Sequence, residues 1–351
     1  MLDLIVVALP VAFSALVFSL ALATDPHDLV LQRITAPSVL QDRGYPAETL
    51  ADLLENKINT IVDDAASTYK TKGIEIDTSD TAIDQFTDIL KVGAPVRATQ
   101  RLLGFVNYIA DVSFLELQDQ TFRVNLRIRD ANSLETLRLQ ELHGNEDQVD
   151  DLLDGVARGI VGFIEPYIMA AYLYNRALDS GAEPPNFDEA LTYIRDRLPS
   201  TDPSYRAWFY SLLGKIAERS HDVDAATNYY QAALRWQPGF PPALVNWGHA
   251  LAGSFQYDQA IERYRAALAI DPDLAIAHLY LAEALLAEGE FKEALAEMAR
   301  ARMLAPDMVR VYELQAGLYE DVGLPEFAES ERQKAQVALL RQPRQRVYEA
   351  M

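Results

Sequence analysis

The pattern of apolar and polar positions divides the chain into three parts. Leu4 to Ala23 is a run of 20 residues without a charge. Residues 25–165 combine alternating stretches, typical of strands, with stretches of helical spacing. From position 166 on, the spacing is helical and a fixed period appears. The pattern therefore predicts an apolar N-terminal segment, a small mixed domain and an all-helical region.

The middle part, residues 25–165, is predicted to be an α/β sandwich with helices on a sheet. Thr121 to Arg129 alternates strictly between apolar and polar residues, which predicts a half-buried strand. Strands near 111–117 and 135–141 would complete a three-stranded meander. Ala47 to Tyr69 has the apolar spacing of an amphipathic helix. Further elements are predicted as strands at 34–39 and 73–77, a helix carrying Ile83 to Leu90 and a helix at 146–164, in the order β-α-β-α-β-β-β-α.

The C-terminal half repeats itself. Three similar stretches end at Pro238, Pro272 and Pro306, which are 34 residues apart. A fixed period of this size indicates a stacked helical array. Small residues recur with the same period at three positions, namely Gly214, Gly248, Ala282 and Ala316, then Ala226, Ala260, Ala294 and Ala328, then Ala233, Ala267, Ala301 and Ala335. Small side chains let two helix axes approach closely, so we expect these residues at helix crossings.

This pattern resembles the tetratricopeptide repeat, whose unit is two antiparallel helices. The resemblance implies an all-α superhelical solenoid with four units at 207–240, 241–274, 275–308 and 309–342. A degenerate unit is expected at 166–206, and residues 343–351 form a basic tail. The fourth unit has Gln315, Arg332 and Gln336 where apolar residues would be expected, which is typical of a polar cap.

The resemblance also implies a concave groove lined by the first helix of each unit. The candidate partner-binding residues are Trp208, Lys215, Arg219, Val245, His249, Ile276, Leu279 and Glu283, and Glu218 and Arg310 occupy further groove positions. Packing against a neighbouring helix is an equal alternative for Trp208, Ile276 and Leu279. The groove lacks the paired Lys and Asn residues with which some family members hold a peptide carboxylate.

The stretch FRVNLRIRDANSLETLRLQELHG, followed by a helix and then by repeats, looks like the TolB-like N-terminal α/β domain that precedes such repeats in many bacterial proteins. The opening ITAPSVLQDRGYPAETLADLLENKI is similar to the beginning of membrane-anchored bacterial repeat proteins. The first strand lacks the usual Leu-Pro-Phe ending and no β-propeller follows, so the resemblance does not carry over a Tol partner.

The net charge and the length of the apolar segment limit the classes of partner and the location that we expect. The 351 residues carry 52 acidic and 31 basic side chains, a net charge of −21, so nucleic acid is not an expected partner. Leu4 to Ala23 is long enough to cross a bilayer as a helix. We expect residues 1–24 to be a retained anchor, although Ala21 to Ala23 fits a signal-peptide cleavage site. The short N-terminal tail favours a single-pass protein of the bacterial inner membrane with its body in the periplasm.

Candidate chemistry is scarce. The chain has no cysteine, no phosphate-binding loop and no His-Glu-x-x-His or Gly-x-Ser-x-Gly motif, so we predict no catalytic residue, metal or cofactor. Arg123, Arg127, Arg129 and Arg138 form a basic side of the meander, which would either pair with Glu116, Glu135 and Glu141 or bind an acidic partner. The sequence favours a non-enzymatic scaffold that binds a protein or peptide. A ligand-binding or hydrolytic domain at 34–165 and a self-associating envelope subunit are the alternatives, and the oligomeric state stays open.

Overall fold

The computed structural model describes residues 27–65, 106–119 and 121–341. The chain divides into two compact units, residues 1–172 and 173–351, which we describe separately. The predicted membrane span, the strand at 73–77, the helix carrying Ile83 to Leu90 and the basic tail at 343–351 lie outside the described residues. Within the described ranges, no helix has both the length and the apolar character needed to span a bilayer.

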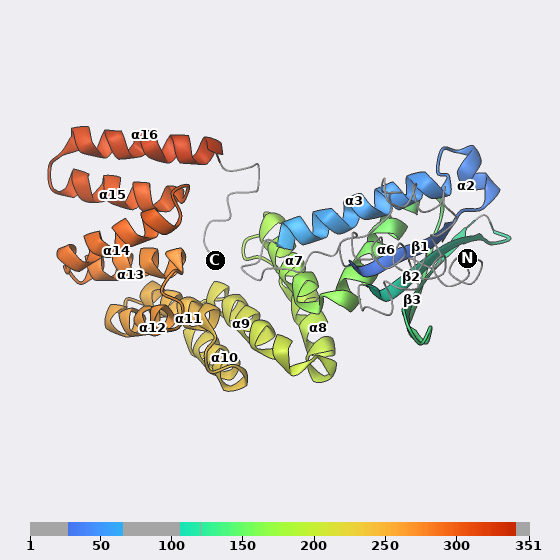
Figure 1. The fold of residues 1–351 in the computed structure, drawn as a ribbon, viewed down its shortest axis with the longest axis horizontal. Helices are drawn as coiled ribbons and strands as arrows, with labels where there is room; N and C mark the ends of the chain where they lie inside the picture. Colours follow the sequence, from blue (N-terminus) through green and yellow to red (C-terminus); the bar gives the residue numbers. More distant parts are fainter. Residues whose placement is uncertain (1–26, 66–105, 120, 342–351) are drawn as a thin grey trace, which may run out of the picture. The chain divides into compact units, whose positions relative to one another are not determined.

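The first unit contains one sheet, with strands β1 (His27–Thr35), β2 (Val106–Glu116), β3 (Phe122–Asp130) and β4 (Thr136–Gly144). The strands lie in the order β1-β2-β3-β4 (Figure 1). β1 runs parallel to β2, and the other neighbours are antiparallel. The predicted meander is therefore confirmed as β2 to β4.

The start of this unit differs from the prediction. β1 ends at Thr35, and Ser38–Asp42 forms the short helix α2 where the strand at 34–39 was expected. Pro37 explains the change, because proline has no N–H to donate to a sheet. Its carbonyl instead accepts hydrogen bonds from the backbone N–H groups of Leu40 and Gln41, at 3.1 and 3.2 Å.

Two long helices pack on the sheet of the first unit. α3 (Ala47–Ala65) contacts β1 and α6, and α6 (Val149–Ile164) contacts β3 and β4. A short 3-10 helix, Glu146–Gln148, precedes α6, so α6 begins three residues later than predicted. A Cβ atom at Gly155 would lie 2.8 Å from Leu142, and one at Gly159 would lie 2.8 Å from Leu126. These two glycines, one turn apart, therefore allow α6 to lie close against the sheet.

The second unit is helical, and α7 (Pro166–Asp179) crosses the boundary into it. The helices that follow are α8 (Asp188–Arg197), α9 (Pro203–Arg219), α10 (Val223–Trp236), α11 (Pro241–Gly253), α12 (Tyr257–Ile270), α13 (Ala275–Ala287), α14 (Phe291–Leu304), α15 (Val309–Asp321) and α16 (Pro325–Arg341), with a 3-10 turn at Leu198–Ser200. α9 to α16 form four successive antiparallel hairpins, and each hairpin stacks on the next (Figure 1).

The small residues lie at helix crossings, as their spacing predicts. A Cβ atom at Gly214 would lie 2.4 Å from the Tyr230 ring, and one at Gly248 would lie 2.6 Å from the Tyr264 ring. The alanines of the second helices are buried, namely Ala226, Ala233, Ala260, Ala267, Ala294, Ala301, Ala328 and Ala335, and so are Ala282 and Ala316 of the first helices. Pro238, Pro272 and Pro306 each follow two residues after a second helix ends. The 34-residue period is thus the period of the hairpin stack.

Candidate functional site: a polar band on the first helices

Polar side chains continue from one first helix to the next. Lys215, Glu218 and Arg219 lie on α9, His249 on α11, Glu283 on α13 and Arg310 on α15. We call these six residues the first-helix band. Three of them lie on α9, and the other three follow one by one on α11, α13 and α15, so the band extends over the four units.

Direct contacts join the band across the units. Nδ1 of His249 lies 2.6 Å from Oε1 of Glu218, which connects the first and second units. The His249 ring lies 5.1 Å from the ring of Tyr280 on α13. Nε of Arg310 donates to Oε1 of Glu283 at 3.0 Å, which connects the third and fourth units. The band is therefore a connected feature and not a set of isolated surface charges.

Buried tyrosines lie beneath the band. Tyr174, Tyr230, Tyr264 and Tyr280 all belong to the core of the array. The Tyr230 hydroxyl donates to Oε2 of Glu218 at 3.2 Å, so both oxygens of this carboxylate have a partner. Burial, followed by the charge of Glu218, raises the pKa of Tyr230 well above its usual value. Burial also raises the pKa of Tyr264 and Tyr280, so these hydroxyls stay protonated at neutral pH.

Within the first-helix band, Lys215 has the most strongly shifted pKa. Its ammonium group lies 5.0 Å from the centre of the Tyr174 ring, a cation–π arrangement. Burial lowers the pKa of Lys215 to about 8, although the nearby Glu218 charge opposes this effect. Within the part of the chain that the structure describes, no carboxylate lies within 4.0 Å of this ammonium group. Lys215 is therefore a half-buried cation stabilised by an aromatic ring.

Four of the predicted partner-binding residues belong to this band, namely Lys215, Arg219, His249 and Glu283. Their binding to a partner stays a prediction.

The other four predicted residues pack into the array. Val245 is 3% exposed and Leu279 is 1% exposed, so both side chains pack inside the array. Ile276 is partly buried against the same core cluster. Trp208 packs edge-on against Phe240, with 4.6 Å between the ring centres. The packing alternative therefore describes Trp208, Ile276 and Leu279 in this structure.

Sequence reasoning missed the contribution of Tyr280. Its position in the repeat is an interior one, and the side chain is indeed buried, but its ring lies tilted beside the His249 ring, with 5.1 Å between the centres. Tyr174 was missed for a different reason, because it precedes the regular units and only the fold brings it to Lys215.

The basic side of the sheet is partly neutralised, but not by the predicted glutamates. Arg129 forms an ion pair with Asp111 of β2 at 2.6 Å. Arg138 donates to Gln140 at 3.1 Å on its own strand. In the described parts of both units, no three side chains of the metal-ligating types come together.

Comparison with known proteins adds one finding about the array. Residues 251–318, from the end of α11 into α15, match the family model of the tetratricopeptide repeat. This stretch is therefore similar to tetratricopeptide repeats. The match agrees with the hairpin stack and with the 34-residue period, and it covers the predicted unit 275–308 and parts of the units on either side of it. No curated protein matches the sequence.

Solved structures are similar to parts of the chain. The crystal structure of MamA has a TM-score of 0.37 at 21% identity, covering 44% of this chain and 88% of that chain. Cut9–Hcn1 of the APC/C has a TM-score of 0.44 at 17% identity, covering 53% of this chain and 35% of that chain. The first tetratricopeptide repeat domain of Spaghetti (RPAP3), bound to an HSP90 peptide, has a TM-score of 0.30 at 18% identity, covering 40% and 97%. These scores carry no argument about a partner.

Proposed function

We propose that the chain is a membrane-anchored, non-enzymatic scaffold that holds a protein or peptide partner on its tetratricopeptide repeats. The observation that supports this proposal is the first-helix band, which places charged and polar side chains on four stacked units. Such a surface offers directional contacts to an extended or helical segment and needs no reacting group.

The proposed anchor is Leu4 to Ala23, with the body in the periplasm of a bacterium. The small α/β unit would then lie between the membrane and the repeats along the chain, as in proteins with a TolB-like domain. Fusions of a periplasm-active and a cytoplasm-active reporter to the C-terminus test the orientation. Activity of the periplasmic reporter alone is the expected result, and activity of the cytoplasmic reporter alone would contradict the proposal.

The binding proposal can be tested with the full chain purified from membranes. The variant Arg219→Glu combined with His249→Ala alters one exposed and one partly exposed member of the band. Arg235→Glu is a matched control, since Arg235 is an exposed arginine on α10 of the same hairpin. Proteins that co-purify with the wild type and the control, and are lost from the band variant, would support the proposal. Equal recovery from all three chains would contradict it.

A further inference from the structure

One backbone position in the array has an unusual occupant. The turn between the two helices of each hairpin contains a residue with positive φ, and the period places His221, Phe255, Gly289 and Gly323 at this position. Glycine adopts this left-handed conformation freely, whereas a bulky side chain does so rarely. Phe255 has a φ of 61°. The second unit therefore keeps phenylalanine where the third and fourth units have the residue that suits the backbone.

Packing does not explain this phenylalanine. The Phe255 side chain is 80% exposed, so its unfavourable backbone is not offset by burial in the array. Its ring contacts the neighbouring Tyr257 edge-on, with 6.2 Å between the centres. The hairpin turn requires the left-handed backbone at this position, but it does not require a phenylalanine there. Residues held in sparsely populated backbone conformations cluster at functional sites, which favours a functional role for this side chain.

Other exposed apolar residues lie at the equivalent turns of the hairpins that follow. Because the hairpins stack in one orientation, their internal turns follow one edge of the array. Figure 1 shows the last of these turns, between α15 and α16, at the left. We call the segments 254–262, 287–293 and 320–329 the turn edge. It exposes Phe291 at 55%, Val322 at 59% and Phe327 at 57%, in addition to Phe255. Exposed aromatic residues that recur in consecutive units mark an interaction surface.

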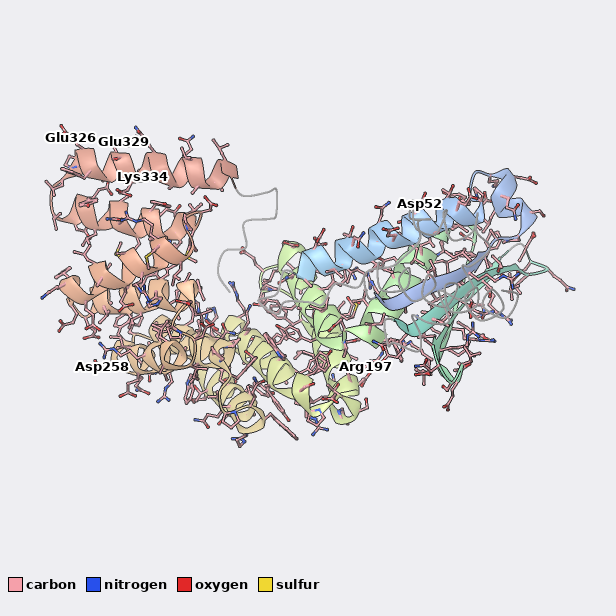
Figure 2. The ribbon with its side chains drawn as sticks, in the orientation of Figure 1. Asp52, Arg197, Asp258, Glu326, Glu329 and Lys334 are labelled. Atoms are coloured by element: carbon pink, nitrogen blue, oxygen red, sulfur yellow. The ribbon has the colours of Figure 1, made fainter. Side chains whose placement is uncertain are left out.

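The turn edge is also strongly acidic. Its three segments contain nine acidic residues and a single basic residue, Lys292. Three of the carboxylates, Glu262, Glu293 and Glu320, form ion pairs with arginines outside the segments, which leaves an acidic excess. Figure 2 shows three of the carboxylates, Asp258, Glu326 and Glu329, at this edge. Acidic residues between exposed aromatic rings repel phosphate-rich surfaces and attract positively charged side chains.

We propose that the turn edge is a second docking surface, which binds a basic amphipathic segment of a partner protein, with Lys or Arg interleaved with apolar residues. The apolar side chains of that segment would contact Phe255, Phe291 and Phe327, and its cations would lie among the carboxylates. This surface is separate from the first-helix band, so either proposal can fail without the other.

The test uses the full chain in detergent and a fluorescein-labelled synthetic helix of leucine and lysine as the probe. Replacing lysine by glutamate, or leucine by serine, gives two control probes. The expected result is that the leucine–lysine probe binds most tightly, since it alone matches both features. Tighter binding of either control probe would overturn the proposal.

A triple variant, Phe255→Gly, Phe291→Ser and Phe327→Ser, removes the aromatic rings and leaves every charge in place. The matched control is Ile270→Ser, Met303→Ser and Leu340→Ser, which removes exposed apolar residues near the opposite ends of the same second helices. We expect the turn-edge triple to weaken probe binding about tenfold or more and the control triple to leave the Kd unchanged. No change in the first, or equal loss in both, would overturn the proposal.

Two further measurements separate loss of binding from loss of folding, and a partner protein from a second copy of the chain. Phe255→Gly alone should fold with an unchanged or higher Tm and still weaken binding, which separates binding from folding. Chemical crosslinking reports whether a second copy covers the edge. If the wild type crosslinks to itself and the turn-edge triple does not, the edge belongs to a self-association interface and the proposal is overturned.

Discussion

Replacing Gly248 by alanine tests the packing of the array most sharply. The added Cβ atom would lie 2.6 Å from Cε1 of Tyr264, where ordinary contact begins at 3.4 Å. Tyr264 is buried and its ring lies 5.9 Å from that of Tyr280, so it has little room to move. Alanine favours a helix over glycine by about 1 kcal/mol. Overpacking costs roughly 1 to 3 kcal/mol, so we expect a net loss of up to about 2 kcal/mol.

Gly317→Ala is the matched control, because Gly317 lies within α15 and an added Cβ atom would have no neighbour within 4 Å. This change should raise the free energy of unfolding by roughly 0.5 to 1 kcal/mol through helix propensity alone. Urea denaturation of the full chain, followed by far-UV circular dichroism, measures both variants. A Gly248→Ala chain as stable as the Gly317→Ala chain would refute the reasoning.

The next repeat of the array shows which second substitution should compensate for Gly248→Ala. One repeat further on, the equivalents of Gly248 and Tyr264 are Ala282 and Met298. Methionine is flexible and unbranched, so it can share the crossing with an alanine methyl group. Adding Tyr264→Met to Gly248→Ala should therefore recover stability. A double variant less stable than the sum of its single changes would argue against this pairing.

Three further changes test other parts of the account. Ala260→Leu overpacks a fully buried crossing and should cost roughly 1 to 3 kcal/mol; an unchanged Tm would count against the packing role. In His278, Nδ1 lies 2.5 Å from Glu297 and Nε2 lies 2.9 Å from the Pro272 carbonyl oxygen. His278→Ala removes both contacts and should lower the free energy of unfolding, measured by urea titration, by about 1 to 3 kcal/mol. No loss would show that these contacts do not stabilise the array. Burial lowers the pKa of Lys215 to about 8 from 10.5, so the unfolded chain holds this proton more tightly and stability should rise with pH between these values. Lys215→Met should be more stable at pH 7 and lack this rise, and parallel pH curves for the two chains would contradict the assignment.

The helical array could be predicted in some detail because its information is local and repeated. Each unit repeats the same small positions, so the period alone gave the hairpins and the crossings at Gly214 and Gly248. The exposure of first-helix residues could not be predicted in the same way, since it depends on how closely neighbouring units stack. Val245 and Leu279 are buried for this reason, while His249, four residues after Val245, stays partly exposed.

The sheet of the first unit shows a different limit. The alternation of apolar and polar residues predicts that a segment is a strand, but it does not predict which strand lies beside it. The parallel pairing of β1 with β2 joins segments separated by about 70 residues, and it emerges only from the fold. Arg129 likewise pairs with Asp111, which is not the residue directly opposite it in the register.

Site-specific crosslinking tests the central claim most directly. A photoreactive phenylalanine analogue is placed at Arg219 in the first-helix band of the full chain, and at Arg235 in a second chain, and both are irradiated in living cells. The account predicts that one discrete protein adduct forms from position 219 and not from position 235. Adducts of the same kind and yield from both positions, or none from position 219, would contradict the claim that the band holds a partner.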